Sequence, residues 1–78
     1  MESIRQIRKE VGMKQRELAE RLDMIQQNYS NMENGTYVPH DIKDKRKKAL
    51  KILMPLLVEK IMEVRADLNR LEYLSLNK

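Results

Sequence analysis

Apolar side chains recur at helical spacing along this 78-residue chain, and strand-like alternation rich in β-branched residues is absent from the sequence. Glycine, proline and Asn-Gly interrupt the helical pattern. The breakers stand at Gly12, Asn34-Gly35, Pro39 and Pro55. We therefore expect an all-α fold: a first helix that Gly12 closes, then helices over about residues 15–22, 25–33, 41–54 and 55–76.

Only Asp23 and Met24 separate the second and third of these helices. So short a connection forces the two helices to cross steeply. Ala19 is small enough to let them approach closely, and the surrounding apolar side chains supply the core of this unit. We expect that core to contain Leu18, Leu22, Tyr29 and Met32. Tyr29 is large for its position, so we expect its hydroxyl to reach the surface.

The last predicted helix carries a heptad pattern, because its apolar residues alternate steps of four and three from Leu50 to Leu71. Twenty-two helical residues span ~33 Å, which is longer than the small N-terminal unit can cover. We therefore divide the chain into a domain over residues 1–54 and a dimerisation helix over residues 55–78. The alternative is that the stripe packs back on the chain's own helices. The predicted homodimer interface consists of Met54, Leu57, Ile61, Val64, Leu68 and Leu71.

The positive charge of the chain is concentrated in one short segment. The formal net charge is +4, and residues 41–54 hold six basic side chains against two acidic ones. Such a segment favours a polyanionic partner, although a run of lysines on a helix can also be a solvated face. We expect Lys43 to contact phosphate.

Several function classes are disfavoured by composition. The chain has no cysteine and a single histidine, His40, so we expect no metal site and no cofactor. No nucleophile–base pair or phosphate-cradling loop can be proposed, so we expect no enzyme activity. No apolar run approaches the ~18–20 residues of a membrane span, and the N-terminus lacks an apolar signal core. We expect a cytoplasmic protein.

The stretch from Gln15 to Gly35 resembles the Cro/CI-type (XRE) helix-turn-helix family. Leu18-Ala19, Glu33-Asn34-Gly35 and Pro39 stand at the offsets of that family, and the resemblance covers residues 4–53. It implies a four-helix helix-turn-helix domain that binds double-stranded DNA, followed here by the long heptad-patterned helix. Three positions depart from the pattern, with Asp23 at the turn glycine and Lys14 and Ile25 at the usual Ser/Thr caps.

The resemblance also implies which side chains touch DNA. The helix over residues 25–33 would enter the major groove and read base edges with its outer face. The predicted base contacts are Gln26, Gln27, Asn31, Ser30 and Ile25. The predicted backbone contacts are Gln15, Asn34, Thr36, Tyr37 and Lys43. We expect Glu33 to hold the following loop through hydrogen bonds.

These observations favour a dimeric transcriptional regulator, specifically a repressor, with two DNA-binding units joined through their C-terminal helices. Two alternatives stay open at this point. One is an antitoxin-like operator binder whose C-terminal helix captures a protein partner. The other is a coiled-coil adaptor that no longer binds DNA. The direction in which two C-terminal helices would pair, parallel or antiparallel, is also open.

Overall fold

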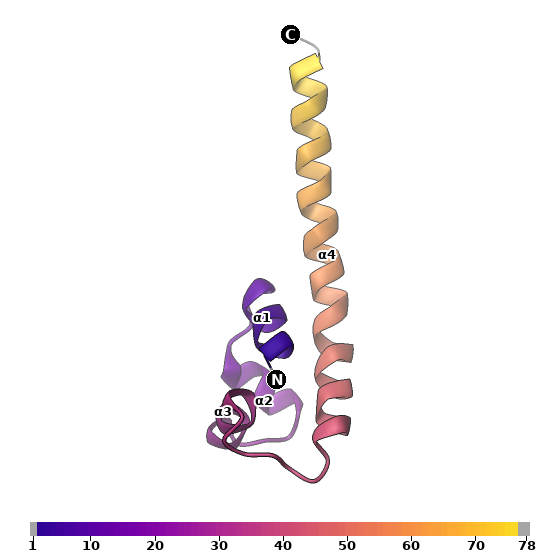
Figure 1. Ribbon diagram of the computed structural model, residues 1–78. Coiled ribbons are helices and arrows are strands. Elements are labelled where there is room, and N and C mark those ends of the chain that lie inside the picture. The colour runs from indigo at the N-terminus through magenta and orange to yellow at the C-terminus, as the bar shows by residue number, and fades with distance from the viewer. Residues whose placement is uncertain (1, 77–78) are drawn as a thin grey trace.

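The computed structural model describes residues 2–76 and the side chains of residues 2–71. Met1, Asn77 and Lys78, which the predicted domains include, lie outside the described residues. The described chain holds no strand, which confirms the all-α expectation. Its helices are α1 (Glu2–Glu10), α2 (Gln15–Arg21), α3 (Gln26–Asn34) and α4 (Ile42–Leu76) (Figure 1).

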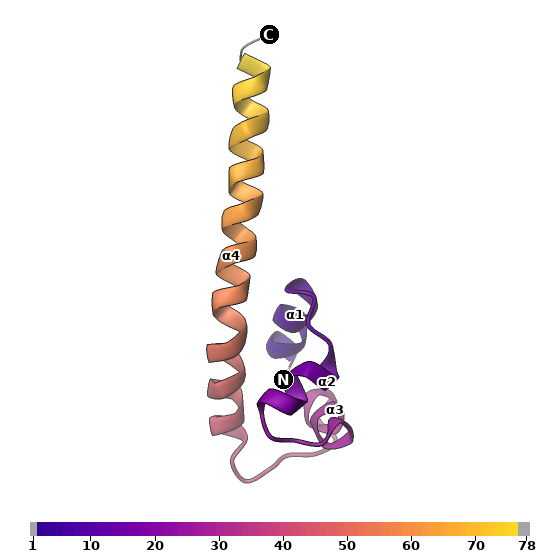
Figure 2. The same cartoon turned by 180° about the vertical axis from the view of Figure 1, so that it is seen from behind.

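The fold combines a small helical head with one long projecting helix. In both views α1, α2 and α3 lie beside the first half of α4, and the rest of α4 extends away from them (Figures 1 and 2). The described residues extend over 58 × 18 × 17 Å. We call residues 2–53 the head and residues 54–76 the stem. The base of α4 serves as the fourth helix of the head, as the predicted fold class requires.

A single apolar core holds the head together, and the predicted core residues Leu18, Leu22, Tyr29 and Met32 are all buried in it. Ala49 and Leu53 bring the base of α4 into the same core. Ala19 is also buried, which confirms its place at the close crossing of α2 and α3. The complete core consists of Ile4, Met13, Leu18, Ala19, Leu22, Tyr29, Met32, Ala49 and Leu53.

Left-handed backbone conformations close the short helices. Gly12 and Gly35 have φ of 75° and 82°, so each ends its helix where a side chain would be strained. Asp23 has φ of 55° at the turn between α2 and α3, the position that the family gives to glycine. Aspartate tolerates this region better than most residues do, so the turn keeps its shape.

The predicted helix break at Pro55 is wrong, because α4 runs through it without interruption. Proline has no N–H to donate to the carbonyl of Lys51, and its ring crowds that carbonyl. Pro55 and Lys51 are both exposed, so water can reach the freed carbonyl. Leu53 is buried and Leu56 is half-buried on the opposite side, and this packing keeps the helix continuous. No helix in the described part of the chain is both long and apolar enough to cross a membrane.

Candidate DNA-binding site

The outer face of α3 is polar and open to solvent. Gln26 and Gln27 are exposed on this face, while Ser30 and Asn31 are half-buried beside them. Ile25, which precedes the helix, keeps 65% of its surface exposed. The sequence predicts that these five residues contact bases. The structure brings Gln26, Gln27 and Ser30 together at one hollow, with Asn31 bonded to Gln27, whereas Ile25 is only shown to be exposed just before the helix.

Two helices begin at a shallow polar hollow on this surface. The hollow has a volume of about 420 Å³ and is lined by Gln15, Gln26, Gln27 and Ser30. Gln15 is the first residue of α2, and Gln26 is the first residue of α3. Neither preceding side chain caps its helix by a hydrogen bond. The first N–H groups of α3 can therefore bind an anion such as a DNA phosphate.

A hydrogen bond between two predicted base contacts orders the middle of this face. The side-chain amide of Gln27 donates to Oδ1 of Asn31 over 3.2 Å, one helical turn apart. The bond uses one donor of Gln27 and one acceptor of Asn31. The carbonyl oxygen of Gln27 and the amide nitrogen of Asn31 can still pair with a base edge, as an adenine requires.

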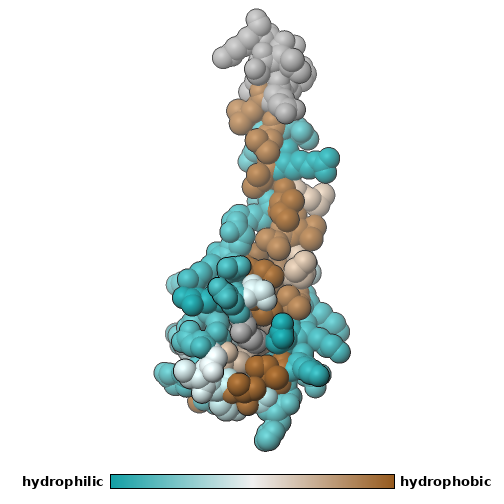
Figure 3. All heavy atoms as spheres, in the orientation of Figure 1, coloured by the Kyte–Doolittle hydropathy of each residue, from teal (hydrophilic) through white to brown (hydrophobic). Residues whose placement is uncertain are grey.

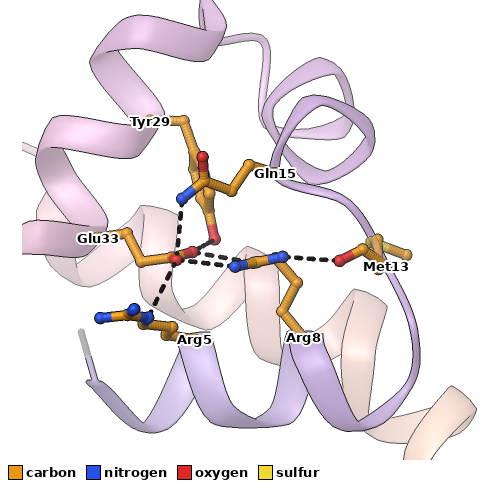
Figure 4. A network of polar contacts seen from close by, with 6 residues as sticks. All are labelled: Arg5, Arg8, Met13, Gln15, Tyr29 and Glu33. Atoms are coloured by element: carbon orange, nitrogen blue, oxygen red, sulfur yellow. Dashed lines mark hydrogen bonds and ion pairs between the residues drawn. The ribbon is translucent and has the colours of Figure 1, made fainter.

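A buried ionic network adjoins the hollow through Gln15, which lines the hollow and bonds to Glu33 (Figure 4). The carboxylate of Glu33 accepts two hydrogen bonds from the Arg8 guanidinium, at 3.0 and 2.9 Å. It also accepts the Tyr29 hydroxyl at 2.5 Å and the Gln15 amide at 3.1 Å. Arg8 donates a further hydrogen bond to the carbonyl of Met13 at 2.8 Å. The network therefore joins α1, the start of α2 and the end of α3.

Mutual stabilisation of charge shifts the pKa values of this network. Burial alone would raise the pKa of Glu33, but the hydrogen bonds from Arg8, Tyr29 and Gln15 outweigh burial and lower it. The hydrogen bond to Glu33 raises the pKa of Arg8. Burial, followed by the bond to Glu33, raises the pKa of Tyr29. Glu33 is therefore held as a carboxylate and Arg8 as a cation at neutral pH.

Two sequence-based expectations about this network are wrong. The Tyr29 hydroxyl does not reach the surface, because the residue is fully buried and the hydroxyl donates to Glu33. Glu33 binds α1 and α2 rather than holding the loop that follows α3. Arg8 was not predicted from the sequence. Its signal was a basic residue one turn after Ile4, on the apolar face of the first helix.

The loop after α3 is held by the backbone carbonyl of Asn31. That oxygen accepts the N–H groups of Thr36 and Tyr37 at 2.9 and 3.2 Å, and the Thr36 hydroxyl at 3.1 Å. The hydroxyl proton of Thr36 is therefore already used within the chain, which weakens the prediction that it contacts phosphate. Asn34 is exposed, and Tyr37 keeps 42% of its surface exposed.

The lysine-rich first turns of α4 contact the turn between α2 and α3. Lys45 donates to the carbonyl of Leu22 at 2.8 Å, and Lys48 lies 3.6 Å from the Asp23 carboxylate. These two lysines therefore stabilise the turn on which the placement of α3 depends. Lys43 is exposed in the first turn of α4, where a backbone contact stays a prediction.

The predicted dimer residues form an apolar stripe that the head leaves largely uncovered. Ile61, Val64, Leu68 and Leu71 are each more than half exposed, Met54 is 43% exposed, and Leu57 is half-buried. Figure 3 shows apolar side chains running from the head up along the stem. The stripe therefore does not pack back on the chain's own helices, apart from Leu50 at its lower end, which packs against the core, while Leu57 lines a hollow beside Glu10.

Comparison with known proteins supports the assignment of this geometry. The family described as Helix-turn-helix matches residues 4–41, which include most of α1 and all of α2 and α3. Neither a curated protein nor a solved structure matched the chain. The family match covers the two crossed helices, the tight turn and the polar face described above. Residues 4–41 therefore form a helix-turn-helix region of the Cro/CI (XRE) type, and this match supports a DNA-binding transcription regulator.

Proposed function

We propose that the chain is a dimeric, sequence-specific DNA-binding repressor that inserts α3 into the major groove. The observation that carries this proposal is the polar surface around the hollow of Gln15, Gln26, Gln27 and Ser30. Its amides and hydroxyl can pair with base edges and phosphates, and a buried ionic network fixes the helices that present them.

Within this surface the amides of Gln26, Gln27 and Asn31 read bases, and Ile25 contacts the methyl group of a thymine. The start of α3, Gln15, Asn34 and Tyr37 hold the phosphate backbone, and Lys43 adds a cationic contact. Repression follows if the site overlaps a promoter, because a bound dimer excludes the polymerase.

The dimer rests on the stripe of the stem. A monomer would expose a contiguous row of aliphatic side chains over ~27 Å of helix, and soluble monomers rarely expose such patches. A second copy would cover the row and would supply the second head. A two-fold dimer of such heads is expected to read two half-sites, ~10 base pairs apart.

The experiment begins with the selection of bound sequences from random duplex DNA by the full chain. Gln26→Ala and Gln27→Ala are then titrated against the selected site and a scrambled duplex at one fixed salt concentration. Each variant should lose ~1–3 kcal/mol on the selected site and almost nothing on the scrambled one. Asn69→Ala, an exposed amide in the stem, is the matched control and should bind like the parent.

Two results would contradict the proposal. Equal losses on both duplexes would mean that the glutamines support only the grip on the backbone. A stem that stays monomeric in sedimentation would remove the dimer and would favour capture of another protein instead.

A further inference from the structure

We propose that two stems pair in antiparallel directions, so that the two heads sit at opposite ends of the dimer. The inference rests on the dimer proposed above and concerns the direction and register of its interface. In this register Ile61 faces Val64 of the second copy, Leu57 faces its Leu68, and Met54 faces its Leu71. All six stripe residues are then covered.

Burial of Leu53 in its own head disfavours a parallel pair. Val58 flanks the stripe and is 48% exposed. In a parallel pair Val58 would lie against Leu53 of the second copy, since flanking residues meet across the seam five positions apart. Leu53 is fully buried in its own head and is not available. In the antiparallel pair Val58 meets Arg65, an exposed residue whose aliphatic part can cover it.

Charges at the other flank of the stripe are complementary only in the antiparallel pair. A parallel pair would bring Lys60 against Arg65 of the second copy, twice in one dimer, and like charges at these positions oppose pairing. The antiparallel pair brings Lys60 against Asp67, which is exposed. Lys60 is already held at the edge of the stripe, because its amine lies 3.1 Å from the Glu10 carboxylate.

The residue types in each core layer also favour the antiparallel pair. Parallel two-stranded coils favour a β-branched residue at the first core position of a heptad and leucine at the second. The heptads here place Ile61 with Val64 and start the next one with Leu68, so this preference is not followed. Antiparallel pairing instead packs Ile61 against Val64 and Leu57 against Leu68, which keeps β-branched and leucine layers separate.

A hollow at the junction of head and stem fits this arrangement. It has a volume of about 230 Å³ and is lined mainly by apolar groups of Leu57, Ile61 and Val64, with Glu10 and Lys60 at its edge. In the antiparallel pair it receives the middle of the other stem, which carries no head at that level. The two Ala49 residues are then 27 residues apart along the stem axis, ~40 Å, which is comparable with one turn of DNA.

Cysteine cross-linking tests the direction directly, because the chain has no cysteine of its own. Leu57→Cys and Leu68→Cys are made as separate proteins, mixed, equilibrated and oxidised mildly. The antiparallel dimer predicts a mixed disulfide between the two variants. It also predicts little product from Leu68→Cys alone, because the two copies of residue 68 would be 11 residues apart, ~16 Å, and a disulfide needs less than ~7 Å.

The opposite result, rapid cross-linking of Leu68→Cys alone with no excess of the mixed product, would establish a parallel stem and overturn the inference. Absence of both products would overturn it too. Sedimentation of the unmodified chain separates these failures from loss of the dimer itself. As a second measurement, Asp67→Lys should weaken the dimer about tenfold. Glu63→Lys, a matched change away from the seam, should leave the dimer dissociation constant unchanged.

Discussion

Removing the charge of Glu33 should destabilise the head more than any other single change to a polar residue. The carboxylate is fully buried and accepts four hydrogen bonds, two of them from a guanidinium whose side chain is 8% exposed. In Glu33→Gln the cation of Arg8 stays buried without its counter-charge. The amide NH2 of the new side chain would also point toward the N–H and O–H donors that now bond to the carboxylate. Breaking one partner of a buried ion pair costs ~3–5 kcal/mol.

That cost is large beside the whole stability of the molecule. A domain of this size is stabilised by ~4–12 kcal/mol, so Glu33→Gln should remove about a quarter of the total stability or more. Tyr29→Phe removes one hydrogen bond to the same carboxylate and leaves three in place, so it should cost only ~1.5–3 kcal/mol. The order of the two losses is as informative as their size.

Urea unfolding followed by circular dichroism measures both variants. All samples are kept at a single protein concentration, because the proposed dimer would make stability depend on concentration. The double variant Arg8→Met with Glu33→Leu completes the test. It removes both charges together and should be more stable than Glu33→Gln. A loss below ~1 kcal/mol for Glu33→Gln, or a double variant that is less stable than the single one, would refute the reasoning.

Four further outcomes are expected. Because the pKa of Glu33 is lowered on folding, its contribution is present above its ordinary value of 4.5 and is lost as the pH falls below that value, so acid unfolding of the parent should be steeper than that of Glu33→Gln. Lys43→Ala should weaken binding to all duplexes alike and reduce the salt slope by about one unit, and an unchanged slope would make the residue part of a solvated face. Pro55→Ala restores a backbone donor inside α4 and should raise the free energy of unfolding by up to ~3 kcal/mol, measured as a higher melting temperature. A lower melting temperature would show that the proline is required. Ala19→Leu should cost ~1–3 kcal/mol by forcing α2 and α3 apart, measured as a lower urea midpoint.

The head could be predicted from sequence because its constraints are local. A two-residue connection allows few crossings, Gly35 ends α3 where Asn34-Gly35 predicted an end, and Ala19 fits the crossing that such a turn requires. The polar face of α3 followed from the same pattern. Which of its side chains touch DNA stays a prediction.

The ionic network could not be predicted in this way, because its partners are distant in sequence. Arg8 and Glu33 are 25 residues apart, and no local sequence pattern around either residue predicts that they pair. Tyr29 illustrates the same limit, since its size suggested an exposed hydroxyl and its burial depends on the Glu33 carboxylate. At Pro55 the local signal was strong, but the packing of Leu53 and Leu56 against the head outweighed the loss of one backbone hydrogen bond.

The continuity of α4 links the proposed dimer to the proposed DNA surface. One helix contributes Ala49 and Leu53 to the core, and two of its lysines bind the turn before α3. Higher on the same helix, Lys60 bonds to Glu10 at the end of α1, which fixes the head against the stem at a second point. The head is therefore attached to α4 at two places and should not rotate independently of it. Pairing of two stems would then fix the positions of both heads. For a two-fold dimer this rigidity decides the distance and angle between the two copies of α3, so the geometry of the operator would be set by the stem as much as by the residues that read it.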